Sequence, residues 1–231
     1  MITKFFKNLC AICIATVTVS SCSFGGNDIA MVSDEGIAKV KEVVKTHVNP
    51  DEYKIYQLSW KEDGGDRKLD NILSQIDVRY IDKEGNNYDL SIDLEDGKFV
   101  PGEARKGNQA GFYSYNLTTP IDLEGLNAEK IRNILGEAGE VLSQQEDGDQ
   151  YEFKSVESID FYISPVRKSY EDRWDGWKDE DKAKYKQVEK KFEMNFTKKD
   201  ERDEVRGKRI VTNYYTIPFI VNREGKVELE Q

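Results

Sequence analysis

Apolar and polar side chains alternate along two neighbouring segments of the chain, 75–81 and 87–95. The stretch between them, Asp82-Lys83-Glu84-Gly85-Asn86-Asn87, has the composition of a turn. Alternation with a period of two places every second side chain on one face of a strand, so the pattern predicts a hairpin over 75–95 with one buried face. A shift of one residue would bury the charged side chains, so the register is strongly set. Seven large side chains define the buried face: Ile76, Val78, Tyr80, Tyr88, Leu90, Ile92 and Leu94.

A different period, typical of an amphipathic helix, occurs at two places. Ser33 is a good N-cap, Asp34 and Glu35 follow it in the first turn, and Asn49-Pro50 ends the pattern, which predicts a helix over 34–48. Asn127 is the N-cap of a second predicted helix at about 127–142. The first apolar stripe is Ile37, Val40, Val44 and His47, and the second is Ile131, Ile134, Leu135, Ala138, Val141 and Leu142.

Further alternating segments predict the remaining strands. Tyr56, Leu58 and Trp60 indicate one strand, and residues 151–163 indicate a long strand with an irregularity near Val156. The last part of the chain predicts three more strands over 192–196, 210–221 and 227–229. Pro218 lacks a backbone N–H, so it indicates an edge or a bulge in the second of these.

The order of these elements predicts an α+β protein, because each helix is followed by a run of strands rather than alternating with them. We expect two lobes, each one helix followed by an antiparallel β-meander, over 33–102 and 120–231, with 103–119 as the connection. The element order and the hairpin turns at 82–85 and 222–225 weakly resemble PepSY-like and cystatin-like modules. The PepSY resemblance implies a non-catalytic module that binds or restrains other exported proteins.

The N-terminus has the zones of a secretory signal. Lys4 and Lys7 precede an apolar stretch of eleven residues, Leu9–Val19, whereas a transmembrane helix needs roughly 20. The following Val19-Ser20-Ser21-Cys22 resembles the lipobox of bacterial lipoprotein precursors, an aliphatic residue, two small residues and a cysteine. In that family signal peptidase II cuts before the cysteine, whose thiol carries diacylglycerol and whose new amino group is acylated.

The resemblance implies a signal peptide over 1–21 and a fatty-acylated, palmitate-bearing Cys22. The alternative is an ordinary signal peptide with an incidental cysteine, which would leave one unpaired thiol in an oxidising compartment. In the lipoprotein sorting known from enteric bacteria, aspartate after the cysteine retains the protein in the inner membrane, so Ser23 favours the outer membrane. The small and polar residues that follow predict a flexible tether over 22–32.

Charge narrows the class of partner. The formal net charge is −10, and it becomes −12 when Lys4 and Lys7 leave with the signal peptide. An acidic chain repels the phosphates of nucleic acid and the headgroups of anionic lipid, so we expect no nucleic-acid partner and contact with the membrane only through the anchor. Aromatic residues make up 11% of the chain, which indicates a folded body rather than disorder.

Motifs for catalysis and cofactor binding are missing. His47 is the only histidine and Cys22 the only cysteine left after cleavage, so a zinc site and a histidine-based nucleophile are both unsupported. Neither a Walker A nor a G-x-G-x-x-G motif occurs, so we expect no nucleotide and no cofactor. A carboxylate pair for glycoside hydrolysis stays open, because its geometry is spatial rather than sequential.

The most unusual stretch of the mature chain is Tyr170-Glu171-Asp172-Arg173-Trp174-Asp175-Gly176-Trp177. Trp174 and Trp177 on an acidic background suit a glycan or a cationic peptide, with Tyr170 beside them, although both indoles also suit packing onto the sheet. We therefore expect a non-enzymatic, lipid-anchored binding or assembly module of the cell envelope. The alternatives are a PepSY-like inhibitor of exported proteases and a glycan-directed hydrolase.

Overall fold

The computed structural model describes residues 28–65, 67–206 and 209–230, and the predicted signal peptide and Cys22 lie outside these ranges. The N-terminal half contains α1 (Asp34–His47), β1 (Lys54–Glu62), β2 (Leu73–Ile81), β3 (Asn87–Glu95), β4 (Lys98–Pro101) and β5 (Arg105–Lys106). The C-terminal half contains α2 (Ala128–Ser143), η1 (Gly148–Gln150), β6 (Tyr151–Tyr162), η2 (Lys168–Gly176), α3 (Asp179–Ala183), β7 (Glu189–Lys198), β8 (Glu204–Arg206), β9 (Arg209–Val211), β10 (Tyr215–Val221) and β11 (Val227–Leu229).

Both predicted helices and the predicted hairpin are confirmed. The Ser33 hydroxyl accepts a hydrogen bond from the Gly36 N–H, and the Asn127 side chain accepts one from Lys130, each at 2.9 Å, so both N-caps satisfy a free helix donor. In the hairpin, Ile76 lies opposite Ile92 across β2 and β3. The inward side chains of the two strands therefore share one face, as the alternation requires.

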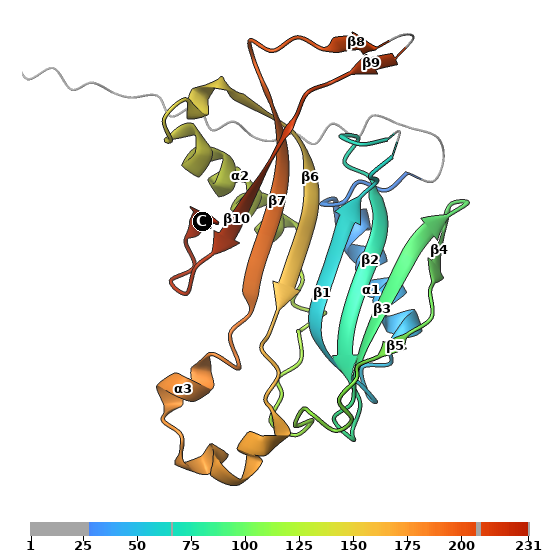
Figure 1. The fold of residues 1–231 in the computed structure, drawn as a ribbon, viewed down its shortest axis with the longest axis vertical. Coiled ribbons are helices and arrows are strands. Elements are labelled where there is room, and N and C mark those ends of the chain that lie inside the picture. The colour runs from blue at the N-terminus through green and yellow to red at the C-terminus, as the bar shows by residue number, and fades with distance from the viewer. Residues whose placement is uncertain (1–27, 66, 207–208, 231) are drawn as a thin grey trace, which may run out of the picture.

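The two predicted meanders form one continuous antiparallel sheet with the strand order β11-β10-β7-β6-β1-β2-β3-β4, and β5 pairs beside β3 (Figure 1). The two halves are joined through their first strands, because Gln57–Lys61 of β1 pairs with Ser158–Tyr162 of β6. Buried residues of both halves also belong to one apolar cluster. The α+β class is confirmed, whereas the layout as two lobes is not.

The helices cover only one face of this sheet. Figure 1 shows α1 behind β2 and β3, and α2 behind the strands of the second half, while the front of the central strands carries no other element. The buried residues of α1, among them Ile37, Val40 and Val44, pack into the core on the helix side. One sheet face is therefore part of the core and the other is open.

Three local features of the second half can be compared with the strands predicted from the sequence. The irregularity predicted near Val156 is confirmed, since the register of β6 against β7 shifts on both sides of it. The predicted strand over 210–221 is wrong as a single element, because β9 and β10 are separate. Pro218 lies in β10, just before the pairing of β10 with β11 begins at Phe219. The missing backbone N–H of Pro218 therefore costs no hydrogen bond between these two strands.

The predicted tether is too long at its C-terminal end. Ala30 forms an antiparallel bridge with Ile72, and Met31 and Val32 are buried. Asp28 forms a two-pronged ion pair with Arg67, at 2.6 and 2.8 Å. Residues 28–32 are thus fixed to the body, because two apolar side chains there complete the core; the rest of the predicted tether lies outside the described residues.

Candidate functional site

The face of the sheet opposite the helices is open in front of the central strands (Figure 1). It consists of alternate residues of five neighbouring strands, whose pairing aligns them in three rows. We call this set the open face: Gln57, Ser59, Lys61, Gln75, Asp77, Arg79, Asp89, Ser91, Asp93, Ser158, Asp160, Tyr162, Glu189, Lys191 and Glu193.

The open face is polar and acidic, with six acidic and three basic side chains among its fifteen residues. Each basic residue forms an ion pair: Lys61 with Asp77 at 3.8 Å, Arg79 with Asp89, and Lys191 with Glu230, which follows β11. Within the described part of the chain, Asp93 and Glu189 form no ion pair. The face therefore keeps negative charge that the protein itself does not neutralise.

Asp160 lies in the middle row of the open face and has an unusual environment. Both of its carboxylate oxygens accept a hydrogen bond from the Gln57 side-chain amide, each at 3.0 Å. Burial between the neighbouring side chains raises the pKa of Asp160, although the Gln57 hydrogen bond and the charges of Lys191 and Arg79 act in the opposite direction. Water solvates this carboxylate poorly, and its neighbours compensate only part of that loss.

The raised pKa of Asp160 predicts a pH dependence of stability. The folded state binds the proton more tightly than the unfolded state, so this group's stabilising contribution is fully present below the unfolded pKa of 3.8 and is lost as pH rises through the folded pKa. We expect Asp160→Asn to remove that decline without lowering stability at neutral pH. Urea titrations between acidic and neutral pH measure it, and an unchanged pH profile in the variant would contradict the assignment.

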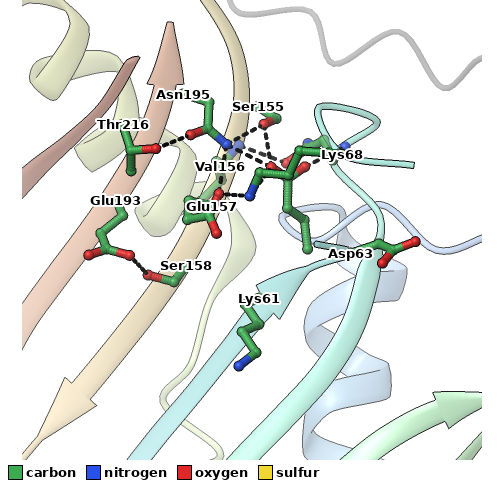
Figure 2. Close-up of polar contacts among 12 residues, drawn as sticks. Lys61, Asp63, Lys68, Ser155, Val156, Glu157, Ser158, Glu193, Asn195 and Thr216 are labelled. Carbon is green, nitrogen blue, oxygen red and sulfur yellow. Dashed lines mark hydrogen bonds and ion pairs between the residues drawn. The ribbon is translucent and has the colours of Figure 1, made fainter. Parts of the chain in front are cut away.

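A buried polar cluster lies at one end of the sheet, where β1 ends beside β6 and β7 (Figure 2). The Glu62 side chain has no exposed surface, and its Oε1 accepts hydrogen bonds from Ser155 at 2.8 Å and Asn195 at 2.7 Å. Its Oε2 accepts from the backbone N–H of Asn71 at 3.1 Å, and the Asn71 side chain in turn accepts from the Val156 N–H. Glu62 therefore holds the loop 63–72 against the second half of the sheet.

Two carboxylates meet in this cluster. Lys68 lies between Glu62, at 3.4 Å, and Glu157, and the Asn195 side-chain amide donates to Glu157 at 2.9 Å as well as to Glu62. A glycoside hydrolase needs its carboxylates free to flank the sugar bond. Here one ammonium and one amide occupy the space between them, so this pair does not favour the hydrolase alternative.

The insertion between β6 and β7 contains the aromatic residues predicted as a contact site, and it lies beyond the lower end of the sheet in Figure 1. Trp174 is buried, with 9% of its surface exposed, while Tyr170 and Trp177 are half-buried. The ring centres of Trp177 lie 5.0 Å from Tyr170 and 5.3 Å from Trp174. The three predicted residues are thus brought together, and a fourth that the sequence analysis missed, Tyr185, completes the cluster 5.5 Å from Trp174.

The aromatic cluster has mainly a packing role, with an accessible rim. Four rings contacting one another supply the insertion with a small core of its own. The Lys184 ammonium lies 5.7 Å from the Trp177 ring and 5.4 Å from the Tyr185 ring. Tyr170 and Trp177 are partly exposed at the rim of this cluster, and they remain predicted contacts for a partner.

His47 is half-buried at the end of α1 and lines a cavity of about 270 Å³ with Lys39 and Phe99. Among the described residues, no group of three or more histidine, cysteine, aspartate or glutamate side chains is arranged to hold a metal ion. The fold and these sites describe an α+β protein whose main sheet is covered by helices on one face only, with β8 and β9 forming a separate two-stranded sheet. No protein-family model matches the chain, and no curated protein and no solved structure matches it either.

Proposed function

We propose that this chain is a lipid-anchored protein of the bacterial cell envelope that acts as a non-catalytic binding or assembly module. The observation that carries the proposal is the lipobox-like Val19-Ser20-Ser21-Cys22, placed six residues before the first residue fixed to the folded body. Among the described residues no helix is long and apolar enough to cross a bilayer. Ser23 favours the outer membrane over the inner one.

The Asp28–Arg67 ion pair supports a defined orientation of the anchored body. Six Cα-to-Cα steps separate Cys22 from Asp28 and reach at most about 20–22 Å. The end of the sheet that carries loop 63–72 therefore lies near the lipid surface. Strand β6 runs from the Glu62 cluster toward the insertion, and its six residues beyond Val156 span about 20 Å, so the insertion lies at the far end, away from the lipid (Figure 1).

The binding role is supported by what the exposed surfaces offer. The open face and the rim formed by Tyr170 and Trp177 suit an envelope protein or a glycan, and the excess of negative charge disfavours nucleic acid and nucleotides. The Glu62 and Glu157 carboxylates are already bridged by Lys68 and Asn195, which supports a non-enzymatic role. No cofactor is part of the proposal.

We also propose that the two halves are helix-plus-meander modules of one kind. Their element orders agree, since α1 precedes β1 to β4 and α2 precedes β6, β7, β10 and β11. Their first strands pair with each other at the centre of the sheet, which supports a tandem arrangement related by an approximate twofold axis. The PepSY-like alternative, an inhibitor of exported proteases, would use the same two modules.

Metabolic labelling with palmitate tests the anchor. We expect the wild-type protein to incorporate the label and to partition with membranes, because two or three acyl chains give stable anchoring at about 0.8 kcal/mol per buried methylene. Cys22→Ala is expected to abolish both. Cys22→Ala protein that stays labelled and membrane-bound would overturn the lipoprotein proposal, and Ser21→Ala, which keeps a small residue before the cysteine, is the matched control.

A further inference from the structure

We infer that the open face is a docking surface for a basic protein, one that presents lysine and arginine side chains on a broad, shallow surface. The inference deepens the proposed function and rests on it, because it gives the chemistry of the partner that the binding module would hold. It starts from a sheet face that no described element covers, although the opposite face is buried beneath two helices (Figure 1).

The size of the open face suits a transient complex. Its three rows cover five residues along each of five neighbouring strands, which gives a face of about 24 by 17 Å. Its flat area of about 400 Å² is about half of the roughly 800 Å² per partner of a standard protein–protein interface. A small ligand would use only a fraction of this surface.

The charge of the open face selects the partner. Six acidic side chains oppose three basic ones, and each basic one already has an acidic neighbour. The face offers one large ring, Tyr162, and otherwise only polar side chains, so burial of apolar area cannot be the main attraction. Electrostatic complementarity, which steers association and suppresses wrong partners, is the remaining source of specificity.

Asp160 supplies the least solvated carboxylate of the proposed interface. It faces Gln57 and Ser59 on β1, Arg79 on β2, and Lys191 and Glu189 on β7, and its hydrogen-bond donors come from Gln57. A partner ammonium or guanidinium placed over the middle row would compensate a carboxylate that the protein leaves poorly solvated. A charged group that becomes fully desolvated in an interface matters more than one that stays exposed to water.

One margin of the face limits where the partner lies. Beside α3 and the end of β10, a cavity of about 370 Å³ has a lining in which basic side chains outnumber acidic ones. The basic residues are Lys184, Lys190, Lys191 and Arg223, and the acidic ones are Glu189 and Glu230. We therefore expect the footprint on β1, β2, β3 and β6, with Asp93 at the opposite margin.

An oligolysine peptide is a suitable probe, titrated into isotope-labelled protein at low and physiological ionic strength. We expect saturable binding, with changes in backbone amide chemical shift concentrated on β1, β2, β3 and β6. Binding should weaken at higher salt. The double variant Asp93→Asn/Asp160→Asn should raise Kd by about tenfold, since each removed charge weakens a complementary contact. The control Glu137→Gln/Glu140→Gln removes the same charge from the exposed side of α2 and should change Kd by less than about twofold.

Equal losses in the two double variants would mean that only overall charge matters, and would overturn the docking surface. Shifts spread over both faces, or the absence of saturable binding, would overturn it as well. The proposed lipid anchor is judged separately, because palmitate labelling at Cys22 does not depend on either pair of substitutions.

Discussion

A chain carrying Ile92→Asp is expected to have no cooperative unfolding transition at room temperature. Ile92 has no exposed surface and lies opposite Ile76 in the confirmed hairpin. The change forfeits about 1.5–3 kcal/mol of apolar burial and adds several kcal/mol for a buried, unpaired carboxylate. The sum is comparable with the whole stability of a typical domain, about 5–15 kcal/mol. Circular dichroism during thermal and urea unfolding measures the effect.

The neighbouring residue provides the control for Ile92→Asp. Asp93 belongs to the open face, so Asp93→Asn should change the free energy of unfolding by no more than about 0.5 kcal/mol. A wild-type melting curve for Ile92→Asp, or a large loss for Asp93→Asn, would show that the hairpin faces the other way.

The same variant tests whether the two halves behave as separate lobes. One apolar cluster contains buried residues from both, so the second half should lose its structure together with the first. Hydrogen exchange of β7 and β10 distinguishes the two cases. Protection that persists there in Ile92→Asp would support the two-lobe prediction, and its loss would support a single cooperative unit.

The local elements could be predicted because their signals lie within short windows. The alternation over 75–95 specifies both strands and their common face, and the Ser33 and Asn127 caps begin the helices where the apolar stripes begin. These features depend on backbone geometry and side-chain burial over a few residues. Tertiary context has little room to change them.

The joining of the halves could not be predicted in the same way. Gln57 of β1 lies opposite Tyr162 of β6, about a hundred residues away, and alternation fixes which face a side chain takes but not which strand lies beside it. The fixed segment 28–32 did carry a signal. Ile29, Met31 and Val32 make the end of the predicted tether apolar, and Met31 and Val32 are core residues.

The Glu62 cluster was missed for a physical reason. Glu62 follows Trp60 at the inward period of β1, but it stands next to the turn-like Asp63-Gly64-Gly65, where a carboxylate is expected in solvent. Hydrogen-bond donors from Asn71, Ser155 and Asn195 make the burial of this carboxylate tolerable. These donors are distant in the sequence, so the sequence alone does not show that they surround Glu62. Among the described residues, every fully buried polar side-chain atom has a hydrogen-bond partner.

Glu62→Leu is expected to lower the free energy of unfolding by about 3–5 kcal/mol, because removing one partner of a buried polar network leaves the others unpaired. Leucine has a similar volume but accepts nothing from Ser155, Asn195 or the Asn71 N–H. Urea unfolding at neutral pH gives the difference. Asp63→Asn, in the adjacent loop, keeps an acceptor for the Gly65 N–H and is the matched control, with an expected change below about 0.5 kcal/mol.

A second substitution separates the role of charge from that of hydrogen bonding. Lys68→Met removes the ammonium that Glu62 shares with Glu157. If ion pairing dominates, the double variant Glu62→Leu/Lys68→Met should lose clearly less free energy of unfolding than the sum of the losses in the two single variants. If the donors from Asn195 and Asn71 dominate, the costs should add, because those groups stay unsatisfied in either background. We expect near-additivity: Lys68 retains some contact with water and lies nearer to Glu157, whereas Glu62 has no exposed surface and receives three hydrogen bonds. A coupling energy above about 1.5 kcal/mol would contradict this and make the ion pair the centre of the cluster.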